Sequence, residues 1–529
     1  MYCFNARLAS WLFIVSSLWL TTDALCLAAA PKEFRFTIKH FTVEGLSPLS
    51  QAFMDDYFKP LQNRIYSLKE LQEVSKEFEK VIHEQGYIFY QVIVPQQTLA
   101  AGDVKLKVIA FTLGKIDVTG NDYFSKDNIM ASLPRLKKSA SPNAVDLSEA
   151  IKVANKHPSK QVQVTFKPSK TPDEIDADIA VTNQRPYQAS LIGNNYGTST
   201  SGDYRLIAAL QYSNLFGLDH IANASYSISP DHIDTVKQYG GSYSLPVYRT
   251  KGWLSAYYAN SSVNIGTVAT DITVTGSGEM YGIHYLQYLP KWGKYEHNLD
   301  IGIDTRYFVN SVLVNTLDVG SNVRSTPFSV LYKGEYPWLN THTSYYLQWV
   351  ANTAIGGQNS QSNYWNASTS VGSRFDAKQD WQLLRYGGNF LVNVKDWLVQ
   401  TTLIGQQSPN PLIAGEQLGI GGSFDVRGYG QRETAADSAQ IIKFEVTTPT
   451  WEKTSLFSFY DYGHGHQQSV TPGQVQDYGL SGTGIGTRFQ WRDYFMGNVT
   501  YAHALDTAPD VGGTKAGQNR IYAMIVFKY

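Results

Sequence analysis

The sequence predicts a mainly β protein, in which a 16-stranded transmembrane β-barrel follows two α+β domains. Only 17% of the 529 residues are charged and 13% are aromatic, and there are 43 glycines. This composition is typical of many strands and turns rather than of disorder. Past residue 30, no uncharged apolar run approaches the roughly 18 residues of a membrane-spanning helix. The net charge of -1 gives no electrostatic case for binding nucleic acid.

Residues 1–30 are expected to form a secretory signal peptide. A single arginine gives a positive start, residues 8–20 are apolar, and residues 28–30 are alanines suited to cleavage. A short anchor helix is the alternative, but the apolar run is too brief to span a bilayer comfortably. Cys26 lacks the apolar and small residues that precede a lipidated cysteine. Because Cys3 is the only other cysteine, the mature chain is expected to have no disulfide.

Residues 34–112 are expected to form the first α+β domain. Residues 34–44 alternate as a strand, and Ser67 with Glu70 has the spacing of a capping box that opens a helix. One face of this helix carries the apolar residues Leu71, Val74, Phe78 and Ile82. Gly86 is expected to end it. The two strands that follow are expected at residues 88–95 and 104–112.

Residues 113–183 repeat this order and are expected to form the second domain. A strand, two helices and two strands are expected at residues 115–120, 125–133, 147–155, 161–168 and 175–181. Each domain is large enough for a small core of its own. Their pattern is equally compatible with packing modules that bind nothing.

Residues 186–529 are expected to form the barrel. Ile301 and Ile303 alternate with Asp300, Gly302 and Asp304, so that one face suits lipid and the other suits water. A soluble β-sandwich would alternate too, but a segment of this length exceeds a single sandwich. Closure of the sheet pairs the backbone groups of every lipid-exposed strand and leaves an aqueous lumen.

The expected strands number sixteen, and an even number is what bacterial barrels require. They are expected to begin near Pro186, Tyr204, His220, Thr235, Gly252, Ile272, Tyr295, Asn322, Thr341, Trp381, Trp397, Ala439, Thr454, Asp477, Tyr494 and Asn519.

The longest irregular connection within the barrel runs from residue 406 to about residue 437. It contains the run Val426, Arg427, Gly428 and Tyr429, and a connection of this length is normally functional or disordered. In the next strand Phe459, Asp461 and Gly463 share one parity, which should face the lumen because a carboxylate avoids lipid. A loop folded inward would bring Arg427 to Asp461, where arginine offers a two-pronged match to a carboxylate. A plain surface loop is the alternative.

The run at residues 426–429, followed by the strand at 459–463, resembles the paired signature of transporters that join polypeptide-transport-associated (POTRA) domains to an outer-membrane barrel. Two such domains before sixteen strands are similar to the two-partner secretion branch, the TpsB or ShlB/FhaC/HecB-like haemolysin secretion/activation proteins, over essentially the whole mature chain. This resemblance implies that the loop lies in the pore, that Arg427 pairs with Asp461, and that Gly428 and Tyr429 shape the loop.

The resemblance also implies a location and partners. The expected location is the Gram-negative outer membrane, with the POTRA domains in the periplasm. The expected partners are a secreted exoprotein of the TpsA-like, haemolysin/haemagglutinin type, outer-membrane lipid, and the barrel-assembly machinery during biogenesis. Many relatives carry an N-terminal helix that plugs the pore, whereas here only a few residues separate the expected cleavage site from the first strand. Met524 also stands where the terminal assembly signal often has a glycine.

Export of this kind needs no chemical catalysis, so we expect no enzyme activity, no metal and no cofactor. The sequence has neither a phosphate-binding Gly-Lys-Ser/Thr loop nor a nucleophile elbow, and the glycine-rich residues 482–486 are expected to be a packed strand. His464 and His466 lack an evident third metal ligand and are expected to be solvated loop residues. The alternatives to secretion are a factor that assembles other barrels, and a passive porin, which would leave two N-terminal domains unexplained.

Overall fold

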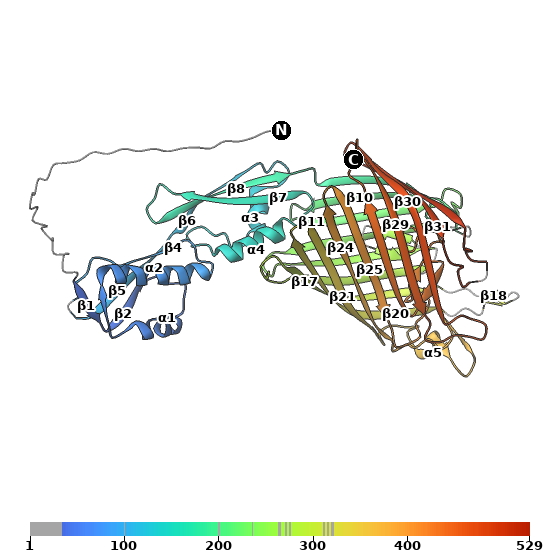
Figure 1. Cartoon of the computed structure of the whole chain (residues 1–529), viewed down its shortest axis with the longest axis horizontal. Coiled ribbons are helices and arrows are strands. Elements are labelled where there is room, and N and C mark those ends of the chain that lie inside the picture. Colours follow the sequence, from blue (N-terminus) through green and yellow to red (C-terminus); the bar gives the residue numbers. More distant parts are fainter. Residues whose placement is uncertain are drawn as a thin grey trace, which may run out of the picture. The chain divides into compact units, whose positions relative to one another are not determined.

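The computed structural model describes residues 34–99, 101–198, 201–234, 236–262, 266–269, 272–274, 277–309, 313–314, 317–318, 322–510 and 512–529. The expected signal peptide therefore lies outside the described residues. The chain divides into two compact units, of which the first contains the described residues up to His83 together with Tyr90–Ala110, and the second contains Glu84–Phe89 and Phe111–Tyr529. Figure 1 labels many of their elements. The domain limits set out above stay a prediction.

The first unit is an α+β fold built on a three-stranded sheet of order β2-β5-β4. Strand β2 runs parallel to β5, and β4 runs antiparallel to it, while β1 pairs with β3. The elements are β1 (Arg35–Ile38), β2 (His40–Gly45), α1 (Gln51–Phe58), η1 (Lys59–Leu61), β3 (Arg64–Ser67), α2 (Leu68–Glu84), β4 (Tyr90–Ile93) and β5 (Asp103–Ala110).

Helix α2 begins with the capping box that the sequence predicts. The Ser67 backbone N–H donates to the Glu70 carboxylate at 2.6 Å, and the Glu70 N–H donates to the Ser67 hydroxyl at 3.2 Å. Leu71, Phe78 and Ile82 are fully buried, as expected for the apolar face. The single strand expected at residues 34–44 is two strands, because the backbone N–H groups of Lys39 and His40 both donate to the Gly102 carbonyl and interrupt the ladder.

The second unit opens with the same arrangement of elements. Its sheet has the order β6-β8-β7, with β6 parallel to β8 and β7 antiparallel to it. Ser125 and Asn143 cap the two helices through their side-chain oxygens. The elements are β6 (Thr112–Thr119), α3 (Lys126–Ser132), α4 (Ala144–Ala154), β7 (Lys160–Pro168) and β8 (Glu174–Asn183).

The rest of the second unit is a closed antiparallel barrel of sixteen strands, which confirms the predicted number. The last strand pairs with the first from Met524 opposite Asn194 to Lys528 opposite Ser190, and this ladder of five residue pairs is the shortest among the described barrel strands. The barrel strands are β9 (Tyr187–Asn194), β10 (Arg205–Leu215), β11 (His220–Ile228), β12 (Lys237–Val247), β13 (Gly252–Ser261), β16 (Gly278–Tyr288), β17 (Glu296–Phe308), β20 (Val323–Trp338), β21 (Thr341–Thr353), β24 (Gln382–Val394), β25 (Trp397–Gln407), β28 (Ser438–Thr447), β29 (Thr454–His466), β30 (Asp477–Trp491), β31 (Phe495–Ala504) and β32 (Asn519–Lys528).

One expected strand start is wrong. Ile272 lies in β15 (Ile272–Val274), which pairs with β14 (Gly266–Ala269) in a two-stranded sheet that is separate from the barrel sheet. The barrel strand β16 begins six residues later, at Gly278. Both segments alternate in polarity, so periodicity alone does not distinguish a connecting hairpin from a barrel strand. Shorter elements also lie in the connections: β18 (Leu313–Val314), β19 (Leu317–Asp318), α5 (Gln361–Tyr364), β22 (Trp365–Asn366), β23 (Val371–Gly372), β26 (Leu418–Ile420) and β27 (Thr434–Ala436).

The two faces of the barrel wall follow the predicted alternation. Ile301 and Ile303 are exposed on the outside of β17, whereas Asp304 is buried within, where its carboxylate accepts from Arg306 at 3.0 Å. This is the pattern of a wall with lipid on one side and polar groups on the other. No helix among the described residues is long and apolar enough to cross a membrane.

Candidate functional site

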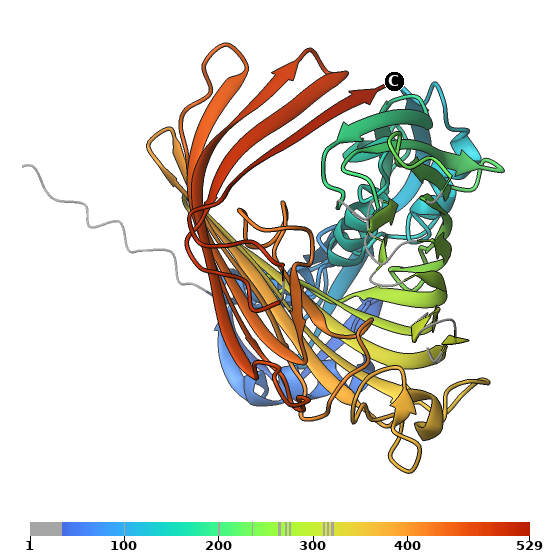
Figure 2. The same cartoon turned by 90° about the vertical axis from the view of Figure 1, so that its right-hand side faces the viewer.

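The connection between β25 and β28, residues 408–437, is called here the pore loop. It is not wholly irregular as expected, because β26 pairs with β27 and makes it a hairpin. Gly421 and Gly422 have φ angles of 107° and 119°, which glycine adopts readily and other residues rarely do. Figure 2 shows this orange segment lying inside the ring of strands.

An apolar strip on the inner wall packs against the hairpin. From the pore loop, Ile420, Val426 and Tyr429 are fully buried. Their neighbours in the same cluster come from β28, β30 and β31 and include Ala439, Ile441, Leu480 and Ala504. Burial of this apolar surface stabilises the inward position of the loop.

Arg427 and Asp461 form a buried, two-pronged ion pair. The Arg427 Nε lies 2.6 Å from Asp461 Oδ2 and its Nη2 lies 2.8 Å from Oδ1. The backbone N–H of Arg427 donates to the same carboxylate at 3.1 Å. Asp461 is inaccessible to solvent, so that only a partner with this fork of donors satisfies both of its oxygens.

Further charges surround this pair. The Arg427 Nη1 donates to Glu445 Oε2 at 2.9 Å, and the other oxygen of Glu445 accepts from Arg488 at 2.7 Å. Lys443, directly opposite Asp461 in the β28–β29 ladder, donates to the Phe424 carbonyl. Arg427, Lys443, Glu445 and Arg488 also line a lumen cavity of about 250 Å³. The loop tip is therefore held by a network of opposite charges, in which each buried carboxylate has a cationic partner, as buried ions require.

Two phenylalanines give the guanidinium an aromatic support. The Arg427 Cζ lies 3.5 Å from the ring centre of Phe459 and 5.9 Å from that of Phe457. Arginine stacks favourably on aromatic faces at such distances. The two phenylalanines on the lumen side of β29 thus pack against the cation that also binds Asp461.

Glycines, which have no side chain, make room for the close contact between the loop and the wall. A Cβ atom on Gly463 would lie 2.7 Å from Ile420 and 2.9 Å from Val426, and one on Gly482 would lie 1.8 Å from the Arg427 carbonyl oxygen. On the loop itself, Gly428 has a φ of 110° and lies against the wall, where a Cβ would come within 3.1 Å of the Ala504 backbone. The glycines allow the close approach that the ion pair needs.

Tyr429 and Tyr522 hold the two sides of the loop tip. The Tyr522 hydroxyl accepts from the Gly428 N–H at 3.0 Å and donates to the Tyr429 carbonyl at 2.5 Å. The Tyr429 hydroxyl lies 2.9 Å from the Ser481 carbonyl oxygen and accepts from the Asp506 N–H at 3.0 Å. Both rings are buried, and their hydroxyls leave none of these backbone groups unpaired.

The structure brings together all seven residues singled out in the sequence: Val426, Arg427, Gly428, Tyr429, Phe459, Asp461 and Gly463. Sequence reasoning missed Glu445, Arg488 and Tyr522 as partners. One signal was present, because Glu445 has the lumen parity of β28. Gly482 was noticed only as part of a strand, which β30 confirms, and its place directly opposite Asp461 emerges from the register.

The expectation that the two histidines lie in a loop is wrong. His464 and His466 lie in strand β29 rather than in a loop, and His466 Nδ1 lies 2.7 Å from Asp477 Oδ1 on the adjacent strand. Across the described part of the chain, no group of three or more His, Cys, Asp or Glu residues could hold a metal ion.

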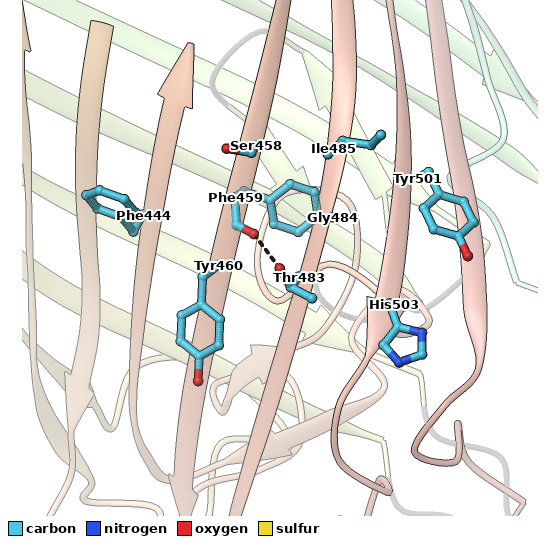
Figure 3. A pocket seen from close by; sticks show the side chains of 9 residues that line it. All are labelled: Phe444, Ser458, Phe459, Tyr460, Thr483, Gly484, Ile485, Tyr501 and His503. Atoms are coloured by element: carbon cyan, nitrogen blue, oxygen red, sulfur yellow. Dashed lines mark hydrogen bonds between the residues drawn. The ribbon is translucent and has the colours of Figure 1, made fainter.

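A larger hollow of about 630 Å³ lies on the other side of this wall. Figure 3 shows Phe444, Tyr460 and Tyr501 around the small residues Ser458 and Thr483, whose hydroxyl donates to the Phe459 carbonyl at 2.9 Å. The surrounding tyrosines and phenylalanine are exposed on the outside of the barrel. The hollow therefore belongs to the apolar outer surface, and the candidate site is the pore loop.

Comparisons with known proteins agree with this architecture. The family model described as haemolysin secretion/activation protein ShlB/FhaC/HecB matches residues 173–489, and the model of the ShlB-type POTRA domain matches residues 36–110. The chain is 23% identical over 491 residues to the outer membrane transporter CdiB-2 of Burkholderia pseudomallei, covering 85% of this chain and 78% of that protein. It is 20% identical over 467 residues to the heme/hemopexin transporter protein HuxB of Haemophilus influenzae, with coverages of 84% and 79%.

Two solved structures share the fold. CdiB from Escherichia coli matches with a TM-score of 0.73 and 18% identity, covering 96% of this chain and 93% of that one. CdiB from Acinetobacter baumannii matches with a TM-score of 0.66 and 16% identity, covering 94% and 91%. The fold of this chain, a barrel preceded by α+β domains, is therefore shared with these two proteins over nearly their whole length.

Proposed function

Because the chain belongs to the haemolysin secretion/activation protein family ShlB/FhaC/HecB, we propose that it recognises an unfolded exoprotein in the periplasm through its POTRA domains and secretes it through the barrel pore. Members of this family are outer-membrane transporters of exoproteins, and the POTRA domains are periplasmic. We propose two finer steps for this chain: recognition of the exoprotein by the POTRA sheets, and its passage past the pore loop.

The observation that carries the proposal is the position of Arg427. It joins the loop tip to the wall through hydrogen bonds, ion pairs and stacking on an aromatic ring, all of which are noncovalent. Such contacts break and reform without chemistry, so the hairpin can leave the lumen and return. A barrel of sixteen strands is wide enough to hold an aqueous channel, and displacement of the hairpin would open it to an extended chain.

Recognition is proposed to occur by addition of a strand to a POTRA sheet, since an exposed sheet edge offers main-chain partners to an unfolded polypeptide. One edge of each sheet is already occupied. In β4, the Val92 N–H donates to Glu79 at 2.7 Å and its carbonyl accepts from Ser75 at 2.7 Å. In β7, Asn155 bonds both backbone groups of Val162. In β6, both backbone groups of Leu113 are bonded to residues 139 and 140 as well. The edge strand β2 of the first sheet is therefore the first place to test.

Outward transport would draw its direction from folding of the exoprotein outside the cell. The proposed partners also include outer-membrane lipid, which exposed side chains such as Ile525 and Phe527 on β32 would contact. The barrel-assembly machinery would read this same terminal strand during biogenesis. Both partnerships follow from a barrel whose outer face is apolar.

The deciding experiment is deletion of the gene, followed by comparison of the surface and medium proteomes with those of the complemented strain. Secretion predicts the loss of one large exoprotein and little else. A broad loss of outer-membrane barrels would instead identify an assembly factor. Unchanged protein profiles with altered uptake of small solutes would identify a passive porin, and either of these two results would overturn the proposal.

A further inference from the structure

A second buried ion cluster lies at the base of the pore loop, eleven residues before Arg427 in the chain. The Glu416 carboxylate is inaccessible to solvent and accepts hydrogen bonds from Arg306 Nη1 at 2.7 Å and from the Ser325 hydroxyl at 2.7 Å. Arg385 Nη2 lies 3.5 Å from the same carboxylate. These three partners belong to β17, β20 and β24.

The two ion clusters bind the loop to different parts of the wall. Asp461 lies on β29 and Arg306 on β17, and five strands separate these two in the order of the barrel. The pore loop therefore contacts the barrel both at its base, through Glu416, and at its tip, through Arg427. A loop bound at one end alone would be free to turn about that end.

The contact at the base of the loop depends on a balance of buried charges. Two guanidiniums, of Arg306 and Arg385, face the carboxylates of Glu416 and Asp304. Removal of the Glu416 charge leaves these cations with one nearby carboxylate in a largely buried site. An uncompensated buried charge is strongly unfavourable, so the local structure would have to move or admit water.

Apolar packing supports the same base. Leu412 and Ile413, just before Glu416, are fully buried. Their cluster includes Phe308 of β17, Leu383 of β24, and Tyr364 and Trp381 from the connection before β24. This packing fixes the first limb of the pore loop, residues 408–417 before β26, to the wall independently of the tip.

Asp437, which ends the pore loop after β27, binds the second limb of the loop to the first. Its carboxylate accepts from the Leu412 N–H at 2.9 Å and from Gln417 at 3.1 Å, and Arg374 binds both of its oxygens. Between this base and the tip runs the β26–β27 hairpin, which begins two residues after Glu416. Base and tip are thus joined by regular, hydrogen-bonded structure that transmits a shift of one to the other.

We infer that Glu416 is a positioning residue, which holds the base of the hairpin where Arg427 can reach Asp461 and about which the hairpin turns when its tip leaves the wall. The inference rests on the proposed role of the loop in export. Its test, however, needs no exoprotein, because the position of the loop can be measured in the purified transporter.

The test is the distance distribution between spin labels on Phe424→Cys, at the exposed tip, and Gln348→Cys, on β21, in full-length protein reconstituted in lipid. Cys3 and Cys26 both fall in the expected signal peptide, so labelling is selective. The parent should show one dominant distance, with a displaced population of about 10% or less. Glu416→Gln should make a displaced tip the major population although Arg427 and Asp461 are intact, and Glu416→Asp should restore the parental distance in part.

Glu335→Gln is the matched control, because it removes an exposed carboxylate from β20 and should leave the distribution unchanged. Arg385→Gln removes the longer contact to Glu416 together with the hydrogen bond from Arg385 Nε to Gln406, and it serves if Glu416→Gln fails to insert. A parental distribution in the inserted charge variants would overturn the inference while leaving the proposed function intact. A displaced tip with normal export would instead support the role of Glu416 and contradict the role of the loop in export.

Discussion

Three donors of Arg427 converge on the carboxylate of Asp461: Nε at 2.6 Å, Nη2 at 2.8 Å and the backbone N–H at 3.1 Å. Both residues are buried. Removing one partner of such a pair leaves the other charge uncompensated, at a cost of about 3–5 kcal/mol. Loss of either partner is thus costly enough to shift the position of the pore loop.

Arg427→Ala should insert into the membrane but export poorly, because the loop tip loses its bond to the wall while the sixteen strands keep theirs. Arg427→Lys should restore export only in part, since an ammonium cannot match both carboxylate oxygens. Heat-modifiable migration reports insertion, and the exoprotein in the medium reports export. Arg492→Ala, in the exposed turn after β30, is the control. Wild-type export by Arg427→Ala would contradict the proposed role of the pair.

Gly482→Ala should displace the loop tip, since the new Cβ would lie 1.8 Å from the Arg427 carbonyl oxygen. Overpacking of this kind typically costs about 1–3 kcal/mol. Gly479→Ala is a matched control on the same strand, where the new Cβ would meet its nearest atom at an ordinary 3.4 Å. Faster cleavage of the pore loop by added protease in Gly482→Ala alone is the expected result. Equal cleavage in both variants would argue against the tight contact.

Tyr522→Phe should loosen the loop without disturbing the barrel. The variant leaves the Gly428 N–H and the Tyr429 carbonyl without their shared hydroxyl, at a cost of about 1–3 kcal/mol for each unsatisfied buried group. Hydrogen exchange at residues 426–431 should rise. Tyr501→Phe, which alters an exposed tyrosine on β31, should leave this exchange unchanged, and a similar rise in both variants would count against the assignment.

His157 should make one contact of the second unit sensitive to acid. Its Nε2 lies 2.5 Å from the Ser213 carbonyl, and its Nδ1 accepts from the Ser159 N–H at 3.2 Å, so the bound ring is neutral. Burial lowers the pKa of His157 below its usual value, against the weaker opposite effect of Asp219. A His157 ring that is released from these buried contacts has the ordinary pKa of about 6.5, so it takes up a proton at a higher pH than the bound ring does. The stability of the contact therefore falls as the pH drops through this value.

The measurement is hydrogen exchange of the Ser159 amide at pH 7.5 and 5.5, corrected for the intrinsic effect of pH on exchange. Protection should decrease at the lower pH. His157→Gln has no proton to gain in this range and should show no such decrease. Equal protection of the parent at both values would refute the prediction.

Much of the fold was predictable because its rules are local. The lipid and lumen faces follow from alternating polarity, so that Ile301 and Asp304 point to opposite sides as expected. The capping box of Ser67 and Glu70 likewise depends on four consecutive residues. The start expected at Ile272 failed for the same reason, since a connecting hairpin alternates as a barrel strand does.

The candidate site was only partly predictable. A carboxylate of lumen parity, and an arginine in a long glycine-rich loop, suggested that Asp461 and Arg427 meet. Nothing in the sequence pattern related Tyr522 to Gly428, because 94 residues separate them, or related Glu416 to Arg306. Such pairs depend on the curvature and register of the closed barrel, which bring distant strands to one loop.

By itself, the sequence determined the order of the strands, the sides that face lipid and water, and the residue types available to the pore loop, because each depends on the polarity of neighbouring residues. Tertiary structure alone decided where the loop is bound. The Arg427 backbone can approach the wall only where Gly482 lies opposite Asp461, and Glu416 finds its cations only once β17 and β24 share a lumen. Both follow from barrel closure, which sets distances that no local pattern encodes.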